Sequence, residues 1–270
     1  MAWLDKDEIR NKVRERYAAI ASSKSAGCGC STPSCCSSKA PSAKSQSSKI
    51  GYSSKDLDTV AEDANMGLGC GNPQSIAMLK RGEVVVDLGA GGGFDCFLAA
   101  RKVGRKGKVI GVDMTPEMVS KARENARKSG ETNVEFRLGE IEHLPVADNI
   151  ADAILSNCVI NLSPDKPQVY REAFRVLKAG GRLAISDVVA IRRIPNTVKR
   201  DFEKHSGCVS GAATVAELER MMRSAGFRDI HVIPKEESAV FIKDWFPGSG
   251  VERYVRSADV RAVKPRIQKR

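Results

Sequence analysis

Short apolar runs alternate with amphipathic stretches along the middle of the chain. Five runs have the length and hydrophobicity of buried strands, and most are separated by stretches with apolar residues at helical spacing. The expected strands are 83–88, 108–113, 134–138, 151–155 and 182–188, and the expected helices are 94–103, 116–129 and 167–177. Strands that alternate with such helices form a parallel sheet covered on both faces. The pattern therefore predicts an α/β fold with a doubly wound, mostly parallel sheet.

The two ends of the chain have different patterns. Residues 1–21 are expected to form an N-terminal helix, because Ile9, Val13 and Tyr17 follow helical spacing. Residues 22–54 are rich in Ser, Lys, Ala, Gly, Pro and Cys, a composition that predicts a flexible linker. The sheet domain is expected at 55–190, and an extension at 191–270 packs on the same sheet. Within that extension we expect helices at 196–205 and 214–224, a strand at 228–234 and a helical tail.

Composition and targeting signals indicate a cytoplasmic protein. No apolar run reaches the roughly 20 residues that a membrane-spanning helix needs, and the first residues are acidic where a signal peptide would be basic. Thiols stay reduced in the cytoplasm. The eight cysteines of this chain are therefore expected to be ligands or redox groups rather than a disulfide framework.

The net charge of +11 suggests nucleic-acid binding until its distribution is examined. Residues 1–55 carry +6 and residues 248–270 carry +5, so the middle of the chain is neutral. Aromatic residues, which stack on bases, make up only 5% of the chain. We therefore expect neither a nucleic-acid partner nor a membrane partner.

The first expected strand runs into the glycine-rich segment Asp87-Leu88-Gly89-Ala90-Gly91-Gly92-Gly93. Glycines let backbone N–H groups approach a ligand closely while the chain turns into a helix. The D-x-G-x-G-x-G spacing resembles class I S-adenosylmethionine-dependent methyltransferases, whereas a dinucleotide site would need glycine where Phe94 stands. Asp87, Gly89 and Gly91 are therefore candidate cofactor-binding residues. A tight turn without a ligand, and a nicotinamide or flavin site, are the alternatives.

Further candidate cofactor residues follow the next two strands. Asp113 ends the second strand, where a carboxylate accepts hydrogen bonds from ribose hydroxyls, and Met114 comes directly after it. Glu140 and the backbone of Ile141 follow the third strand and are candidates for contacting the adenine edge. For Glu140, the alternative is an exposed loop carboxylate.

Three cysteines lie in polar or glycine-rich loops of separate segments. Cys70 precedes the first strand, Cys158 follows the fourth and Cys208 follows the fifth. Loops at the carboxyl ends of the strands line the ligand crevice of a doubly wound sheet, so the three thiols could converge there. Thiolates bind soft acceptors such as zinc, copper(I) and trivalent arsenic. Structural zinc sites usually contain paired C-x-x-C motifs, which this chain lacks.

Several strings of the sequence are similar to those of arsenite methyltransferases, and the resemblance extends from about Tyr52 to Pro265. The strings are 65–73, 111–118, 156–164, 207–212 and 244–250. The resemblance implies a Rossmann-like methyltransferase fold and trivalent arsenic bound by Cys70, Cys158 and Cys208. It also implies an N-terminal cysteine that works with Cys70 in redox turnover. Four cysteines of the linker could fill this role, and we choose Cys35 or Cys36.

The resemblance further implies a reaction and its partners. The lone pair of thiol-bound arsenic attacks the methyl group of S-adenosylmethionine in line with its departing sulfur, and a glutathione- or thioredoxin-type reductant returns arsenic to the trivalent state. Arsenite or its thiol conjugates are the substrates, and we expect a monomer. Two other functions stay open: a small-molecule C- or O-methyltransferase with incidental cysteines, and a non-catalytic sensor that binds arsenic or another soft metal.

Overall fold

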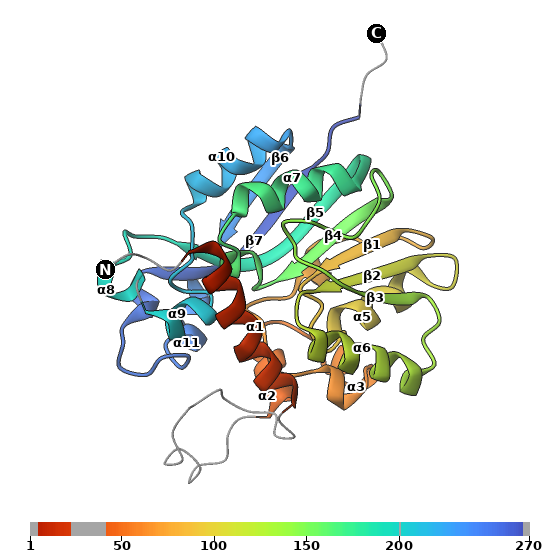
Figure 1. The fold of residues 1–270 in the computed structure, drawn as a ribbon, viewed down its shortest axis with the longest axis horizontal. Coiled ribbons are helices and arrows are strands. Elements are labelled where there is room, and N and C mark those ends of the chain that lie inside the picture. The colour runs from red at the N-terminus through yellow and green to blue at the C-terminus, as the bar shows by residue number, and fades with distance from the viewer. Residues whose placement is uncertain (1–4, 23–41, 200, 267–270) are drawn as a thin grey trace.

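A computed structural model describes residues 5–22, 42–199 and 201–266. Within these residues, seven strands form one sheet with the order β3-β2-β1-β4-β5-β7-β6 (Figure 1). The pairs among β1 to β5 are parallel, and β7 is antiparallel to both β5 and β6. The mostly parallel, doubly wound sheet is therefore confirmed. The strands are β1 (Val84–Leu88), β2 (Lys108–Asp113), β3 (Val134–Leu138), β4 (Ala151–Asn157), β5 (Leu177–Ala190), β6 (Arg228–Pro234) and β7 (Val255–Val263).

Helices cover both faces of the sheet (Figure 1). One apolar core lies between the sheet and α5 and α6, and a second lies between the sheet and α7 and α10. The longer helices are α1 (Lys6–Ser22), α5 (Phe94–Val103), α6 (Pro116–Ser129), α7 (Lys166–Val176) and α10 (Val215–Ala225). The shorter helices are α2 (Ala43–Lys49), α3 (Ser54–Thr59), α4 (Pro73–Ile76), α8 (Asn196–Lys199), α9 (Phe202–Ser206) and α11 (Ala239–Ile242), and 3-10 turns occupy 62–64, 160–162, 236–238 and 251–253.

Local capping signals explain where the main helices begin and end. α6 starts with Pro116 at its first position and ends at Gly130, which has a left-handed backbone. α10 begins with a capping box, in which Thr214 and Glu217 satisfy each other's backbone N–H groups. These two helices match the expected ranges to within one residue because their boundaries depend on neighbouring residues alone.

Two expectations about the ends of the chain are wrong. Residues 255–263 form β7 instead of a helical tail, because β5 and β6 on either side bury alternate residues of this segment and pair with its backbone. The predicted flexible linker is too long, since residues 43–49 form α2, capped by the side chain of Ser42. Residues 23–41 lie outside the described residues.

A third apolar cluster lies at the edge of the sheet where the parallel strands end. It contains side chains of α1, of the loop before β1, of the segment after β4 and of residues 202–255. Helix α1 lies across this edge (Figure 1). Its Lys6 pairs with Asp165 before α7, and its Arg14 donates to the carbonyl of Met114 after β2. Within the described residues, no helix has both the length and the apolar composition needed to cross a bilayer.

Candidate active site

The glycine loop after β1 forms an open cradle. Gly91 has a φ of +51°, and a Cβ added there would meet no atom within 4 Å. Gly89 also has a positive φ, and its missing Cβ makes room for Val159. This loop can therefore bring backbone N–H groups against a nucleoside, as the sequence predicted for a cofactor loop.

Asp113 is held directly beside that loop. Its carboxylate accepts hydrogen bonds from the backbone N–H of Gly91 at 2.9 Å and of Thr115 at 2.9 Å. Burial raises the pKa of Asp113, and these backbone hydrogen bonds lower it. The carboxylate is thus oriented at the end of β2 before any ligand arrives, and the residues present fit an adenosyl group with ribose hydroxyls.

Asp87 lies beneath the loop. Its side chain is buried, and the thiol of Cys96 on α5 donates a hydrogen bond to it at 3.2 Å. Burial, and then the nearby charge of Asp95, raise the pKa of Asp87 well above its ordinary value. Asp87 therefore supports the loop from within the core, and a direct contact with a cofactor stays a prediction.

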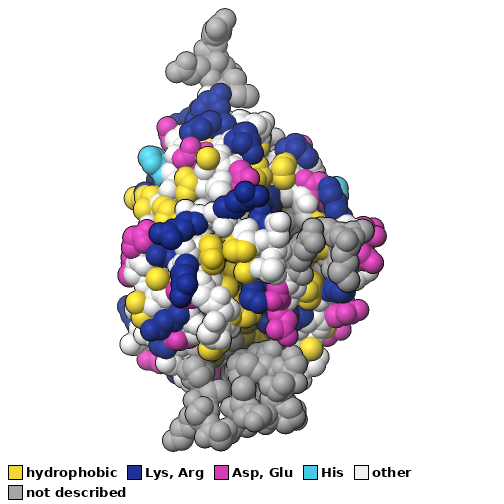
Figure 2. Space-filling model, turned by 90° about the vertical axis from the view of Figure 1, so that its left-hand side faces the viewer, with side chains coloured by type: hydrophobic (Ala, Val, Ile, Leu, Met, Phe, Trp, Pro, Cys, Tyr) yellow, Lys and Arg dark blue, Asp and Glu magenta, His cyan; other side chains and the backbone are white. Residues whose placement is uncertain are grey.

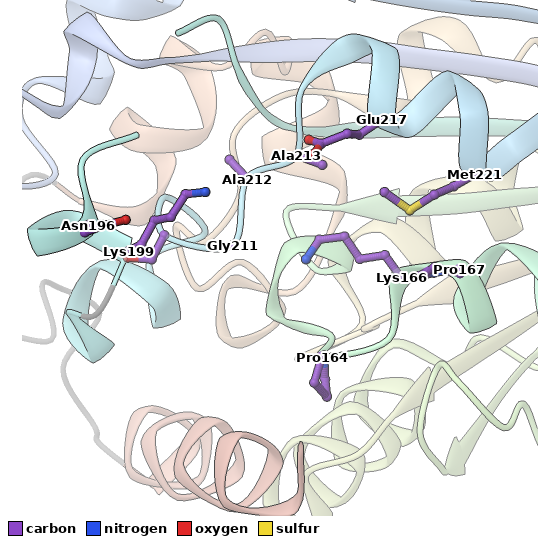
Figure 3. Close-up of a pocket in the computed structure, with 11 residues that line it drawn as sticks. Pro164, Lys166, Pro167, Asn196, Lys199, Gly211, Ala212, Ala213, Glu217 and Met221 are labelled. Carbon is purple, nitrogen blue, oxygen red and sulfur yellow. The ribbon is translucent and has the colours of Figure 1, made fainter. Parts of the chain in front are cut away.

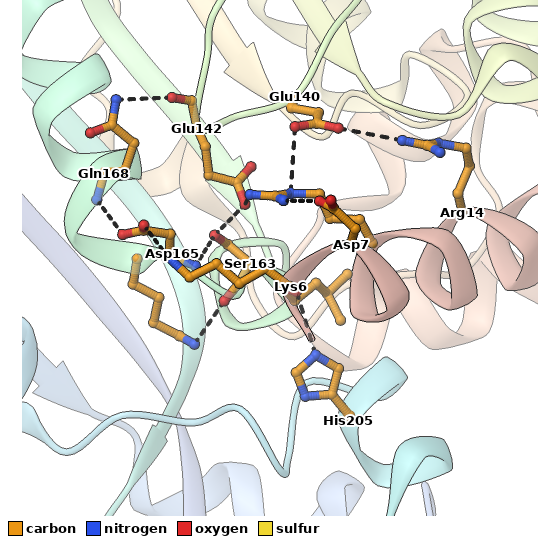
Figure 4. Close-up of polar contacts among 12 residues, drawn as sticks. Lys6, Asp7, Arg14, Glu140, Glu142, Ser163, Asp165, Gln168 and His205 are labelled. Atoms are coloured by element: carbon orange, nitrogen blue, oxygen red, sulfur yellow. Dashed lines mark hydrogen bonds and ion pairs between the residues drawn. The ribbon is translucent and has the colours of Figure 1, made fainter. Parts of the chain in front are cut away.

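The residues expected at the adenine edge lie under helix α1. Glu140 forms ion pairs with Arg10 and Arg14 of α1, each at 3.4 Å (Figure 4). Ile141 is buried in the core with a side-chain exposure of 8%, and Met114 accepts from Arg14 through its carbonyl. Glu140 is thus a loop carboxylate with 31% of its side chain exposed and two cationic partners on α1, and its contact with adenine stays a prediction.

The structure brings Cys70, Cys158 and Cys208 together at the carboxyl edge of the sheet. The Cys70 and Cys158 sulfurs and a carboxylate oxygen of Asp187 lie within 4.8 Å of one another. The Cys208 thiol donates to the carbonyl of Cys158 at 2.8 Å, and the Cys158 thiol interacts with the thiols of both Cys70 and Cys208. Cys158 is thus the central member of a cluster of three thiols, and all of them are free.

Backbone strain helps to direct two of these thiols. Cys158 has a φ of 60° and Cys208 a φ of 63°, in the left-handed region that residues with side chains rarely occupy. Such conformations persist only where surrounding contacts impose them, and they concentrate at functional sites. Here the backbone N–H of Cys158 donates to the carbonyl of Ser186 at 2.8 Å, and the thiol of Cys70 donates to that carbonyl at 3.6 Å.

The environment keeps the thiols of Cys70 and Cys158 protonated. Burial raises the pKa of Cys70, whose side chain is only 1% exposed. Interaction with the thiols of Cys208 and Cys70, together with burial, raises the pKa of Cys158 well above its ordinary value. A ligand that binds two or three of these sulfurs must therefore take up the protons that they lose, or release a group that does.

Asn157 joins the loop of Cys70 to Cys158, its own neighbour in sequence. Its side-chain oxygen accepts from the backbone N–H of Cys70 at 3.0 Å, and its nitrogen donates to the carbonyl of Gly71 at 2.8 Å. The hydroxyl of Ser257 on β7 donates to the carbonyl of Cys70 at 2.6 Å. Sequence reasoning missed both residues. The only signal for Asn157 was its position directly before a candidate thiol.

The sequence also did not predict that two further side chains, those of Asp187 and Tyr17, lie near the thiols. Asp187, near the end of β5, is buried, and its carboxylate accepts from the side chain of Asn161 at 2.9 Å. Tyr17 of α1 packs against the same apolar cluster. Burial, and then the charges of Cys208 and Cys158, raise the pKa of Tyr17 well above its ordinary value. Helix α1 thus contacts the segments after β2 and β3 and packs in the apolar cluster that contains the thiols. Cys35 and Cys36 lie outside the described residues.

Comparisons with known proteins identify relatives of this chain. A family described as a methyltransferase domain matches residues 79–226. An arsenite methyltransferase from Halobacterium salinarum is 50% identical over 97% of this chain and 68% of the relative. Another from Aquipseudomonas alcaligenes is 44% identical over 59% of this chain and 48% of the relative. The chain therefore spans about two thirds of the first relative and half of the second.

A solved structure shares the same architecture. It is an arsenic(III) S-adenosylmethionine methyltransferase from Chlamydomonas reinhardtii, with 31% sequence identity and a TM-score of 0.59. The match covers 84% of this chain and 75% of the other.

Proposed function

The chain belongs to the arsenite methyltransferase family, and from that membership we propose that its Cys70, Cys158 and Cys208 hold trivalent arsenic as the acceptor of a methyl group. S-adenosylmethionine, held by the loop after β1 and by Asp113, supplies this group as an activated sulfonium. The convergence of three free thiols beside the cofactor loop is the observation that carries the proposal. Thiolates are the ligands that soft trivalent arsenic prefers.

Arsenic binding releases no net protons, because each thiol proton leaves as part of a water molecule. When arsenous acid binds, each S–H bond breaks, an As–S bond forms, and the displaced hydroxide leaves with the thiol proton as water. The raised pKa values of Cys70 and Cys158 are therefore compatible with binding at neutral pH. Three thiols on one chain also act at a high effective concentration, in the mM range or above, which favours chelation over free thiols.

The chain supports methyl transfer mainly by orientation. The lone pair of arsenic lies opposite the three sulfurs and is itself the nucleophile, so the reaction needs no general base. Asn157 and Ser257 fix the Cys70 loop, and the apolar cluster that includes Tyr17 keeps water from the sulfurs. Positioning of this kind lowers the barrier because the reacting groups lose no further freedom in the transition state.

Turnover requires electrons from outside the site. Methyl transfer leaves arsenic formally pentavalent, and two electrons return it to the trivalent state. We assign this reduction to Cys70 together with a linker cysteine, Cys35 or Cys36, which an external thiol reductant of the glutathione or thioredoxin type regenerates. All three arsenic ligands come from one chain, which supports function as a monomer.

The test is to incubate the purified protein with arsenite, a thiol reductant and S-adenosylmethionine labelled in its methyl group. Labelled methylarsenicals are the expected product. Arsenic binding without label transfer would instead indicate a sensor. Label transfer to a quinone or sterol, but never to arsenic, would indicate an ordinary small-molecule methyltransferase.

A further inference from the structure

A cavity of about 470 Å³ lies beside the loop that follows Cys208. Its lining comes from the first turns of α7 and α10, from α8 and from the segment Ser210–Ala213, which begins two residues after Cys208 (Figure 3). Small-molecule sites commonly span about 300–1,000 Å³. The cavity is therefore large enough for a small ligand beside the loop that follows Cys208.

Two ammonium groups face each other across this cavity. Lys166 extends from the start of α7 and Lys199 from α8, and both side chains point into the open space (Figure 3). The Nζ of Lys166 donates only long hydrogen bonds, at 3.4 Å to the carbonyl of Asn161 and at 3.2 Å to that of Ser163. Burial lowers the pKa of Lys166, while the charges of Asp187 and then Cys208 raise it. Lys166 therefore interacts electrostatically with Asp187 and Cys208 at the thiol cluster.

One acid, Glu217, also lines the cavity, and hydrogen bonds from Thr214 lower its pKa, so it carries a negative charge. The carboxylate of Glu217 accepts from the backbone N–H and the hydroxyl of Thr214, at 2.8 and 2.9 Å, as part of the α10 cap. The first turns of α7 and α10 add partial positive charge. Lys and Arg side chains are also prominent on the face that carries α8 (Figure 2). Two ammonium groups against one carboxylate leave a net positive charge in the lining, so the cavity favours an anion.

We propose that this cavity binds the carboxylates of a small anionic thiol that carries trivalent arsenic to Cys208. The proposal rests on the proposed function and adds a site that recognises the carboxylates of the arsenic carrier. In the exchange, the S–H bond of Cys208 breaks and an As–S bond forms, while the bond from arsenic to the carrier sulfur breaks. The proton passes to the carrier sulfur, which leaves as a thiol, and no atom changes its oxidation state.

The position of Cys208 determines which thiol binds arsenic first in this exchange. Carboxylates held between Lys166 and Lys199 would keep the carrier sulfur on the side of the cluster where the Cys208 loop lines the cavity. The first As–S bond would then form at Cys208, and Cys158, whose thiol interacts with that of Cys208, would take the second. An uncharged thiol conjugate lacks this guidance and would reach the sulfurs only by diffusion.

The experiment compares an anionic arsenic carrier with an uncharged one. Arsenite is supplied either with glutathione, which has two carboxylates, or with 2-mercaptoethanol, which has none. The KM for arsenic is measured with each carrier, and the readout is the ratio of the glutathione value to the 2-mercaptoethanol value. Lys199→Glu and Lys166→Met test the cavity. Lys106→Glu, at an exposed position in the turn before β2, is the matched control.

In Lys199→Glu the ratio should rise about tenfold, the effect of losing one charge-assisted hydrogen bond, and Lys166→Met should shift it in the same direction. In Lys106→Glu the ratio should keep the wild-type value. A ratio that is unchanged in both cavity variants overturns the proposal, because a structural role would alter both KM values by the same factor. If the wild-type protein methylates arsenic with neither carrier, the proposed function itself fails, which is a separate result.

Discussion

Asn157 should control whether Cys70 reaches arsenic. Replacing it by alanine removes the oxygen that accepts from the N–H of Cys70 and the nitrogen that donates to the carbonyl of Gly71. The same nitrogen also donates to the hydroxyl of Tyr52 at 3.0 Å. The substitution therefore removes the residue that links Cys70, Gly71 and Tyr52 by hydrogen bonds. Cys70 would then keep the hydrogen bond from the hydroxyl of Ser257 to its carbonyl and the long one from its own thiol to the carbonyl of Ser186.

The size of the effect follows from these contacts. Each buried backbone group left without a partner costs about 1–3 kcal/mol, so two such groups lower the free energy of unfolding by roughly 2–4 kcal/mol once water enters the space. Without its clamp, Cys70 changes from a preorganised ligand into a loosely tethered one. Because linking ligands in the right geometry adds about 10²–10⁴-fold to affinity, we expect arsenic affinity to fall about tenfold to hundredfold.

X-ray absorption of the arsenic-loaded protein counts the sulfur ligands directly. We expect three As–S bonds in the wild-type protein and two in Asn157→Ala, with S-adenosylmethionine affinity retained. Asn133→Ala is the matched control, because Asn133 also donates to two backbone carbonyls, those of Ala100 and Gly104, on a helix end far from the thiols. This control should lose stability and keep all three As–S bonds.

One result would refute the reasoning. If Asn157→Ala folds, retains three As–S bonds and binds arsenic as tightly as the wild-type protein, then the side chain of Asn157 does not position Cys70. A stability loss alone would not rescue the argument, since Asn133→Ala is expected to show that loss as well.

Four further predictions concern single residues. Cys158→Ser should abolish methylation of inorganic and monomethylated arsenite but not cofactor binding, as measured by product speciation and calorimetry, and unchanged turnover would contradict its assignment. Cys70→Ser should lose the first methylation and partly retain the second, whereas equal loss of both would argue against a distinct redox role. Asp113→Ala should mainly weaken cofactor binding, and normal affinity in the folded variant would remove it from the site. Burial raises the pKa of Asp187 to about 6, so the native state binds more protons than the unfolded state between pH values of about 4 and 6, and stability should fall as pH rises through that window. Denaturant unfolding of Asp187→Asn should lack this fall, and an unaltered slope would contradict the assignment.

Local patterns were enough to predict most of the sheet and the cofactor loop. β2, β3, α5 and α6 begin and end at the expected residues, because hydrophobic period, Pro116 and the glycines act within a few positions. β7 could not be predicted in this way. β5 and β6 pair with its backbone, and distant segments bury Val255 and Ala258 on the faces of the sheet, so nothing local distinguishes it from a helix.

The sequence by itself determined which chemical groups are available: an adenosyl-binding loop, an acid after β2 and three thiols in separate loops. Only the tertiary structure decided how those thiols are held. Asn157 reaches Cys70 across 87 residues of chain, and Tyr17 reaches the thiols from the first helix. Tertiary packing likewise places Lys166 and Lys199 on facing sides of one cavity. Such contacts depend on the packing of distant segments, and hydrophobic period and motif spacing contain no information about it.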